Sequence, residues 1–102
     1  MSSVSDRPLH CLSSAPRSQA GQRLLAMLEP QDDVLLLGKA VVLAGITHPD
    51  IQEWVASGAQ LHALEEDLRA YGARELHPSI VSTDYAGWVR LSENHQTQVL
   101  WR

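Results

Sequence analysis

The sequence predicts a three-layer α/β domain in which a mostly parallel sheet is covered by helices on both faces. Apolar runs of strand length alternate along the chain with segments of helical period. The run Val34–Leu37 is apolar at every position, which is typical of an interior strand buried on both faces. A chain of 102 residues has room for one hydrophobic core. We therefore expect one small α/β domain of the flavodoxin-like kind, spanning residues 9–102.

Residues 9–44 predict a strand, a helix, a second strand and a helical turn. Leu9 and Cys11 alternate onto one face of the first strand. The helix that follows carries four apolar side chains on one face: Ala20, Leu24, Met27 and Leu28. Gly38 ends the apolar run Val34–Leu37. Residues 39–44 suit either a buried helical turn or a strand, and of the two we expect the helix.

Residues 49–72 predict a helix, a strand and another helix. Pro49 marks the start of the first helix and Gly58 follows its end, with an apolar face made by Ile51, Trp54 and Val55. Leu61 and Ala63 form the strand. The second helix begins with three acidic residues, Glu65, Glu66 and Asp67; its apolar face comprises Leu64, Leu68 and Tyr71, and Gly72 is its expected left-handed stop.

The last quarter of the chain predicts a strand at residues 80–82, a capped helix and a final strand at residues 99–101. Asp84 can accept a hydrogen bond from the backbone N–H of Gly87 and so cap the helix. Tyr85, Trp88 and Val89 then share one apolar helix face. Aromatic side chains are therefore concentrated near the C-terminus.

Composition restricts the class of protein. The formal net charge is -4, and the eight Lys and Arg residues are scattered singly, so direct nucleic-acid binding is not expected. No apolar run approaches the roughly 18 residues of a membrane span, and Met1–Arg7 is too polar to precede a secretory apolar region. A single cysteine excludes an internal disulfide. We expect a cytoplasmic protein with a disordered tail at residues 1–8.

Several short motifs resemble the TusB/DsrH family of sulfur-relay subunits. They comprise Leu9-His10, Val34–Leu37, Leu64–Leu68 followed by Gly72, Asp84-Tyr85, Trp88, Val89-Arg90-Leu91 and Trp101. The resemblance covers nearly all of the chain from Leu9 onward, and it implies a DsrEFH-like fold without a reaction centre or cofactor of its own.

The resemblance also implies partners. A TusB-like subunit of this family assembles with homologous TusC-like and TusD-like subunits into a dimer of heterotrimers. That complex receives persulfide sulfur from a small sulfur-carrier protein and passes it on toward 2-thiolation of the wobble uridine in tRNA. The reactive cysteine belongs to the TusD-like subunit.

A DsrH-like subunit of a sulfur-oxidation complex is the alternative within the family. In relatives from sulfur-oxidising bacteria a cysteine tends to sit within the first helix, whereas residues 19–28 contain none. This departure favours the tRNA-thiolation branch.

A different motif points to a second class of protein. His10-Cys11, five residues and then Arg17-Ser18 match the pattern of cysteine-dependent phosphatases, in which a thiolate attacks phosphate held by backbone N–H groups and an arginine. The intervening residues 12–16 contain no glycine, and Pro16 lacks an N–H. Asp84 could act as the acid, but helix capping already accounts for it. A phosphatase using Cys11 and Arg17 therefore stays the weaker alternative.

Cys11 has two further interpretations. It could carry a persulfide if Arg17 and His10 stabilised its thiolate. However, His10 points to the opposite strand face, and leucines flank the pair, so we favour a small buried side chain.

The remaining candidates lie at a subunit interface. The five histidines lack the spacing of metal ligands, so no metal site is predicted; His95, before the last strand, is an interface candidate, although a solvated loop histidine is the simpler interpretation. Trp54 and Trp88 are expected to face the core, and Trp101 fits a core or an interface equally. The interface candidates are Trp101, Trp88, Tyr85 and His95.

Overall fold

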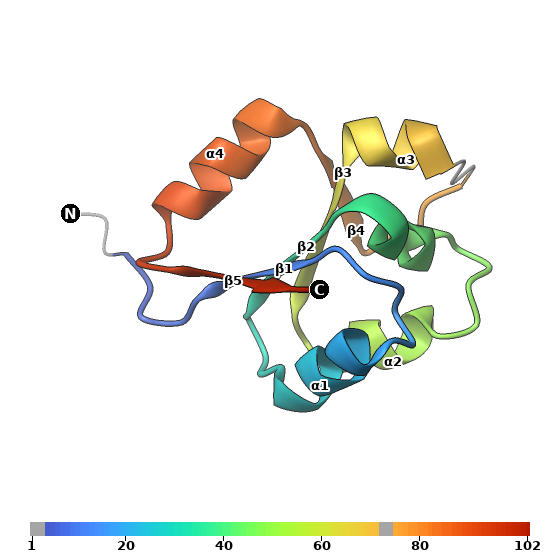
Figure 1. Cartoon of the computed structure of the whole chain (residues 1–102), viewed down its shortest axis with the longest axis horizontal. Helices are drawn as coiled ribbons and strands as arrows, with labels where there is room; N and C mark the ends of the chain where they lie inside the picture. The colour runs from blue at the N-terminus through green and yellow to red at the C-terminus, as the bar shows by residue number, and fades with distance from the viewer. Residues whose placement is uncertain (1–3, 72–74) are drawn as a thin grey trace.

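The computed structural model describes residues 4–71 and 75–102, which form a five-stranded parallel sheet with helices on both faces (Figure 1). The elements are β1 (Leu9–Leu12), α1 (Gln19–Met27), β2 (Asp33–Leu36), the 3-10 helix η1 (Gly38–Ala44), α2 (Ile51–Ala56), β3 (Gln60–Leu64), α3 (Glu65–Tyr71), β4 (Ile80–Thr83), α4 (Tyr85–Glu93) and β5 (Gln98–Trp101). The predicted α/β class and parallel sheet are confirmed.

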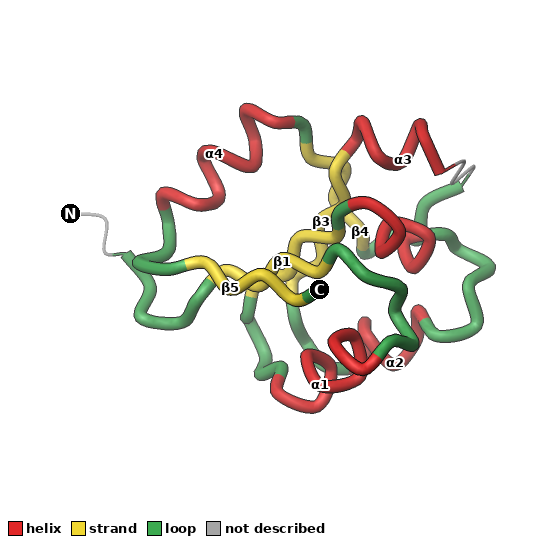
Figure 2. The backbone as a smooth tube through the Cα atoms, in the orientation of Figure 1, coloured by secondary structure: helices red, strands yellow, loops and turns green. Residues whose placement is uncertain are grey.

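The strand order is β4-β3-β2-β1-β5, with every neighbouring pair parallel. β2 is therefore an interior strand, as the apolar run Val34–Leu37 predicts. β4 and β5 lie at opposite edges, so the chain between them, including α4, must cross the sheet (Figure 2). Because α4 belongs to this crossing segment, it runs over the sheet face on which Leu9, Cys11 and Leu35 lie.

Side chains alternate between two cores on the two sides of the sheet. The α1/α2 core contains Leu24, Val34, Leu36, Trp54 and Leu61, among others. The α4 core is smaller: Leu9, Cys11, Leu35, Leu37 and Leu64 are buried, and Trp88 and Leu91 of α4 pack against them. The sheet face under α4 therefore buries fewer apolar side chains than the face under α1 and α2.

Local chemistry explains where two helices begin. Ser18 accepts a hydrogen bond from the N–H of Gly21 at 3.2 Å, and Asp84 accepts one from Gly87 at 2.7 Å, as predicted for Asp84. A Cβ at Gly21 would lie 2.1 Å from the carbonyl oxygen of Pro16. Glycine is therefore required for α1 to pack this close to the preceding loop.

The predicted helices differ from the structure in one detail. Met27 and Tyr71 are exposed, although their spacing placed them on apolar faces, and each lies in the last turn of its helix, beyond the buried Leu24 of α1 and Leu68 of α3. Lys39–Ala44 is helical as expected, in the 3-10 form. The expected stop at Gly72 lies outside the described residues.

Residues 4–8, which we call the N-terminal arm, lie in the segment expected to be a disordered tail, and in the structure they make hydrogen bonds to other parts of the chain. The Ser5 N–H donates to the Asn94 carbonyl at 2.9 Å, and the Gln96 N–H donates to the Ser5 carbonyl at 3.3 Å. The Arg7 guanidinium binds both carboxylate oxygens of Asp32 at 3.0 and 2.8 Å. Sequence composition missed these partners because they come from loops far along the chain. Residues 1–3 lie outside the described part.

The Arg7–Asp32 pair predicts an acid-dependent loss of stability. Hydrogen bonds from Arg7 hold the pKa of Asp32 below its usual value, although burial of this carboxylate opposes the shift. Because the folded-state pKa is lowered, the stabilisation is present at neutral pH and is lost as pH falls through that folded-state value. We expect Arg7→Ala to lower the free energy of unfolding at neutral pH, because the Asp32 carboxylate then loses its cationic hydrogen-bond partner.

Urea unfolding of both proteins at neutral pH and at about pH 3 measures this difference. The difference in the free energy of unfolding between the wild type and Arg7→Ala should become smaller at the acidic pH. Arg69→Ala is the matched control, because Arg69 makes an exposed pair with Glu65 on α3. An Arg7→Ala deficit that is equal at both pH values would contradict the assignment.

Candidate functional site

Cys11 lies on β1, next to the edge strand β5, and is buried in the α4 core. Its Sγ donates to Oε1 of Gln98 on the neighbouring strand at 3.6 Å. Burial raises the pKa of the thiol to about 11. At neutral pH Cys11 is therefore a protonated thiol without access to a substrate, which disfavours both nucleophilic attack and persulfide transport.

Arg17 does not approach the thiol. It lies on the α1/α2 side of the sheet, where its guanidinium binds the Asp50 carboxylate at 2.7 and 3.0 Å. Cys11 faces the opposite side, toward Trp88 and Leu91. Alternation along β1 thus separates the two residues that a phosphatase site would have to bring together.

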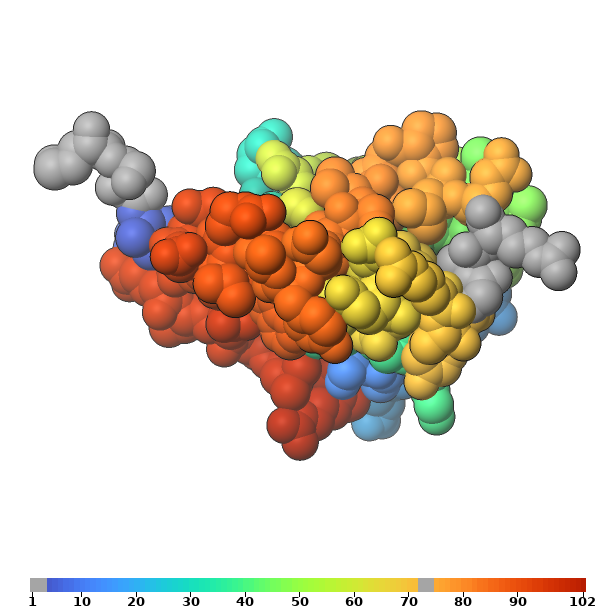
Figure 3. Space-filling model, turned by 90° about the horizontal axis from the view of Figure 1, so that it is seen from above, coloured from blue at the N-terminus to red at the C-terminus, as the bar shows by residue number. Residues whose placement is uncertain are grey.

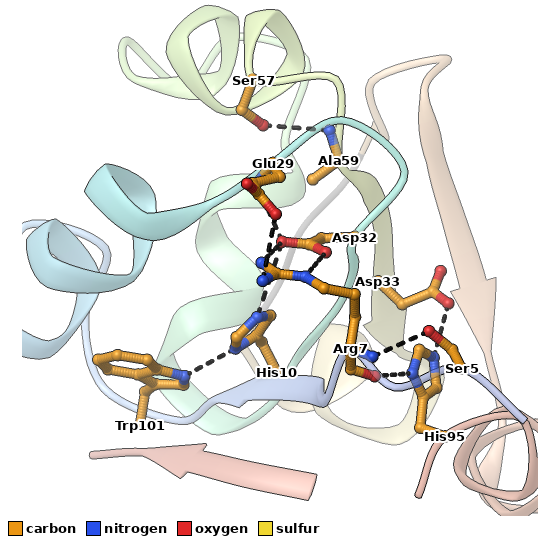
Figure 4. Close-up of polar contacts among 10 residues, drawn as sticks. All are labelled: Ser5, Arg7, His10, Glu29, Asp32, Asp33, Ser57, Ala59, His95 and Trp101. Atoms are coloured by element: carbon orange, nitrogen blue, oxygen red, sulfur yellow. Dashed lines mark hydrogen bonds and ion pairs between the residues drawn. The ribbon is translucent and has the colours of Figure 1, made fainter. Parts of the chain in front are cut away.

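Trp101 is anchored inside the subunit. Its ring packs against the α1/α2 core, and its Nε1–H donates to Nδ1 of His10 at 3.1 Å (Figure 4). Burial lowers the pKa of His10, so its ring is neutral and its Nδ1 is free to accept this bond. His10 Nε2 lies 3.9 Å from Asp32, beyond hydrogen-bond distance. Trp101 therefore fastens the terminal strand to β1.

The other two tryptophans differ in burial. Trp54 is buried in the α1/α2 core, as predicted. Trp88 faces the sheet as expected and packs against the α4 core, but it is only partly buried, and α4 contains no fully buried residue. Its Nε1–H donates to Gln98 at 3.2 Å, and Tyr85 stacks on it with ring centroids 6.4 Å apart. α4 covers the small core with one side and presents apolar side chains on another.

These exposed side chains form the α4–β5 surface, which we define as Tyr85, Val89 and Leu100. Tyr85 and Val89 on α4 are 55% and 60% exposed, and Leu100, on the edge strand β5, pairs with Cys11 and so shares the sheet face that α4 covers. In Figure 3, α4 and β5 are adjacent on the outer face of the molecule. An exposed strand edge beside apolar side chains is typical of a protein interface.

His95 is an internal contact, so its prediction as a solvated loop residue is wrong. Its side chain is 5% exposed. Nδ1 lies 2.8 Å from the Arg7 carbonyl oxygen, and Nε2 lies 2.8 Å from Oδ2 of Asp33. Asp33 Oδ1 in turn lies 3.1 Å from Nε2 of His62 on β3. Because the His95 ring is turned inward, its predicted contribution to a subunit interface is indirect: it holds the loop of residues 94–97 in place.

A cavity of about 620 Å³ opens between α4 and the strands β3 and β4. His62, Glu65, Asp84 and Arg90 are among the residues that line it. It exists because α4, in crossing the sheet, leaves this part of the face uncovered. Carboxylates and cations are both present, so the lining is suited to polar groups of a ligand or of a neighbouring protein.

Neither a metal-binding cluster nor a membrane-spanning helix is found among the described residues. Residues 4–71 and 75–102 contain no group of three or more His, Cys, Asp or Glu side chains arranged to hold a metal ion. In the same ranges no helix combines the length and hydropathy needed to cross a bilayer.

Sequence reasoning missed the contacts of Asp33, His62 and Gln98. Each is a single polar residue in a strand, without a motif of its own. The signal that could have found them is their strand parity: Asp33 and His62 share a face on adjacent parallel strands, as do Cys11 and Gln98. Using that signal requires the strand order, which the sequence alone left open.

Comparison with known proteins gives consistent matches. Residues 13–98 match the family described as DsrH like protein. The chain is similar to Protein TusB of Sodalis glossinidius, with 38% identity over 95 residues, covering 91% of this chain and 99% of that protein. It is also similar to Protein TusB of Escherichia coli O81 and of Cronobacter sakazakii, each with 32% identity over 94 residues and the same coverage.

Proposed function

The chain belongs to the DsrH-like family of sulfur-relay subunits, and we propose that it is the TusB-like, non-catalytic subunit of a complex that relays persulfide sulfur for 2-thiolation of the tRNA wobble uridine. In this role it contributes structure to a cytoplasmic assembly, while a homologous subunit supplies the reactive cysteine.

The state of Cys11 is the observation that carries this proposal. A relay needs an accessible thiolate, whereas the chain's single cysteine is buried and its pKa is raised to about 11. The thiol donates to Gln98, which also accepts from Trp88. Cys11 thus helps to hold β5 and α4 together, which is a structural role.

The proposed partners are a TusC-like and a TusD-like subunit in a dimer of heterotrimers, with small sulfur-carrier proteins reaching the chain only through that complex. The α4–β5 surface supports such a docking face, because it combines an unpaired strand edge with exposed apolar side chains. The formal charge of -4 gives no support to direct contact with tRNA.

Co-expression with the two homologous subunits tests the proposal. We expect a single hetero-oligomer on size-exclusion chromatography with light scattering. The chain expressed alone should self-associate, because the α4–β5 surface is then uncovered. A stable monomer that binds neither of the two homologous subunits would contradict the proposal.

The DsrH-like sulfur-oxidation subunit is the second candidate, and the family match itself favours keeping it. The absence of cysteine from α1 speaks against it. Neighbouring genes distinguish the two: genes for TusC-like and TusD-like subunits without dissimilatory sulfite reductase support tRNA thiolation, and sulfite reductase genes support oxidation.

A further inference from the structure

His95 joins three segments of the chain through its two ring nitrogens. Nδ1 is 2.8 Å from the carbonyl oxygen of Arg7 in the N-terminal arm, and Nε2 is 2.8 Å from Oδ2 of Asp33 on β2. Figure 4 shows the ring between these two oxygens. The surrounding loop is tied to the same arm, since Ser5 bonds to Asn94 and Gln96 and the Leu9 N–H donates to Thr97 at 3.0 Å.

This geometry determines the number of protons in the network. A backbone carbonyl oxygen only accepts hydrogen bonds, and so does an ionised carboxylate. A neutral imidazole has one N–H and can therefore satisfy one of these oxygens but not both. Both contacts form when the ring is an imidazolium, or equivalently when the proton sits on Asp33. Two hydrogen bonds to these oxygens thus require one proton more than a neutral ring beside a carboxylate carries.

The charged and titratable groups around the pair act in both directions. From β3, His62 contacts the other oxygen of Asp33 at 3.1 Å. Burial raises the pKa of Asp33, but hydrogen bonds from His62 and His95 outweigh it and hold that pKa below its usual value. Arg7 and His10 oppose a positive ring, whereas Asp32, which pairs with Arg7, offsets the arginine.

We propose that His95 is a proton-dependent latch, which holds the N-terminal arm and the 94–97 loop against Asp33 only while the His95–Asp33 pair keeps its extra proton. Loss of the proton leaves one oxygen without a donor, so the ring keeps either the arm or Asp33 and releases the other. The 94–97 loop runs directly into β5, so the state of the latch also affects how firmly the proposed docking surface is held.

Hydrogen exchange detected by mass spectrometry tests the latch on the full chain, in the assembly in which it purifies. Protection factors of the peptides that contain Ser5 and Gln96, corrected for the intrinsic pH dependence of exchange, should fall about tenfold or more between about pH 6 and pH 9. Long-range ¹H–¹⁵N correlations of the histidine rings report the protonation state in parallel. His95 should appear as an imidazolium, or hydrogen-bonded to a protonated Asp33, wherever the arm is protected.

Two substitutions have opposite expected results. In Asp33→Asn the new amide donates to neutral His95 Nε2 while its oxygen still accepts from His62, so the arm should stay protected at both pH values. In His95→Ala neither oxygen keeps a donor from position 95, so protection should be low throughout. His77→Ala is the matched control, because the His77 Nδ1 only accepts from Ser79 outside this network.

The wild-type measurement decides the proposal even if a variant fails to fold. A neutral His95 beside an ionised Asp33 in the protected state would overturn it. So would arm protection that is independent of pH in the wild type, or an Asp33→Asn protein that loses protection with rising pH as the wild type does.

Discussion

Replacing Trp101 with aspartate is expected to reduce the free energy of unfolding by about 3 kcal/mol, a large fraction of the stability of a domain of this size. The indole packs against the α1/α2 core and donates to His10 at 3.1 Å. Aspartate removes the apolar contact, leaves the buried His10 Nδ1 without a donor and adds a carboxylate beside the core. Urea or thermal unfolding measures the loss.

Trp101→Phe separates the two contributions. Phenylalanine keeps most of the apolar contact but cannot donate to His10, so we expect a loss of about 1 kcal/mol. If Trp101→Asp unfolded at the wild-type midpoint and failed only in assembly, Trp101 would be an interface anchor instead of a core residue.

The double substitution Tyr85→Asp and Val89→Asp is expected to weaken assembly with the homologous subunits by about a hundredfold or more. Both side chains are more than half exposed, so the free energy of unfolding of the subunit should change by less than about 0.5 kcal/mol. Two carboxylates on an apolar docking face would have to be desolvated without partners. Affinity capture of the tagged chain with its co-expressed partners measures the effect.

Met27→Asp is the matched control for this surface. Met27 is an equally exposed apolar residue, on α1 at the other side of the sheet. Equal loss of assembly in the control would show that added charge, and not the position of the α4–β5 surface, is responsible.

The order and type of the elements follow from local patterns in the sequence. Val34–Leu37 predicts an interior strand because burial on both faces excludes polar residues, and the Asp84 cap follows from its spacing to Gly87. The burial of α4 does not follow, because the apolar spacing of Tyr85, Trp88 and Val89 is the same for a core face and for an interface. Amphipathic spacing identifies an apolar face but not what covers it.

The candidate site was only partly predictable for a related reason. The preference for a structural Cys11 rested on strand parity and neighbouring leucines, and its burial agrees with that preference. His95 was misjudged because its partners, Asp33 and the arm, lie far away in sequence and meet it only through the parallel order of β5, β1 and β2. Contacts of this kind depend on topology, which single-sequence patterns do not specify.

The most direct test of the account is mass spectrometry of tRNA nucleosides from cells whose only copy of this chain carries Cys11→Ser. A structural Cys11 predicts that 2-thiouridine stays near the wild-type level, with a modest loss of subunit stability from the buried hydroxyl. Cells that lack the chain should lose the modification, because the assembly is then incomplete. Disappearance of 2-thiouridine in the Cys11→Ser cells, while the variant still assembles with its partners, would contradict the account and make Cys11 a sulfur carrier.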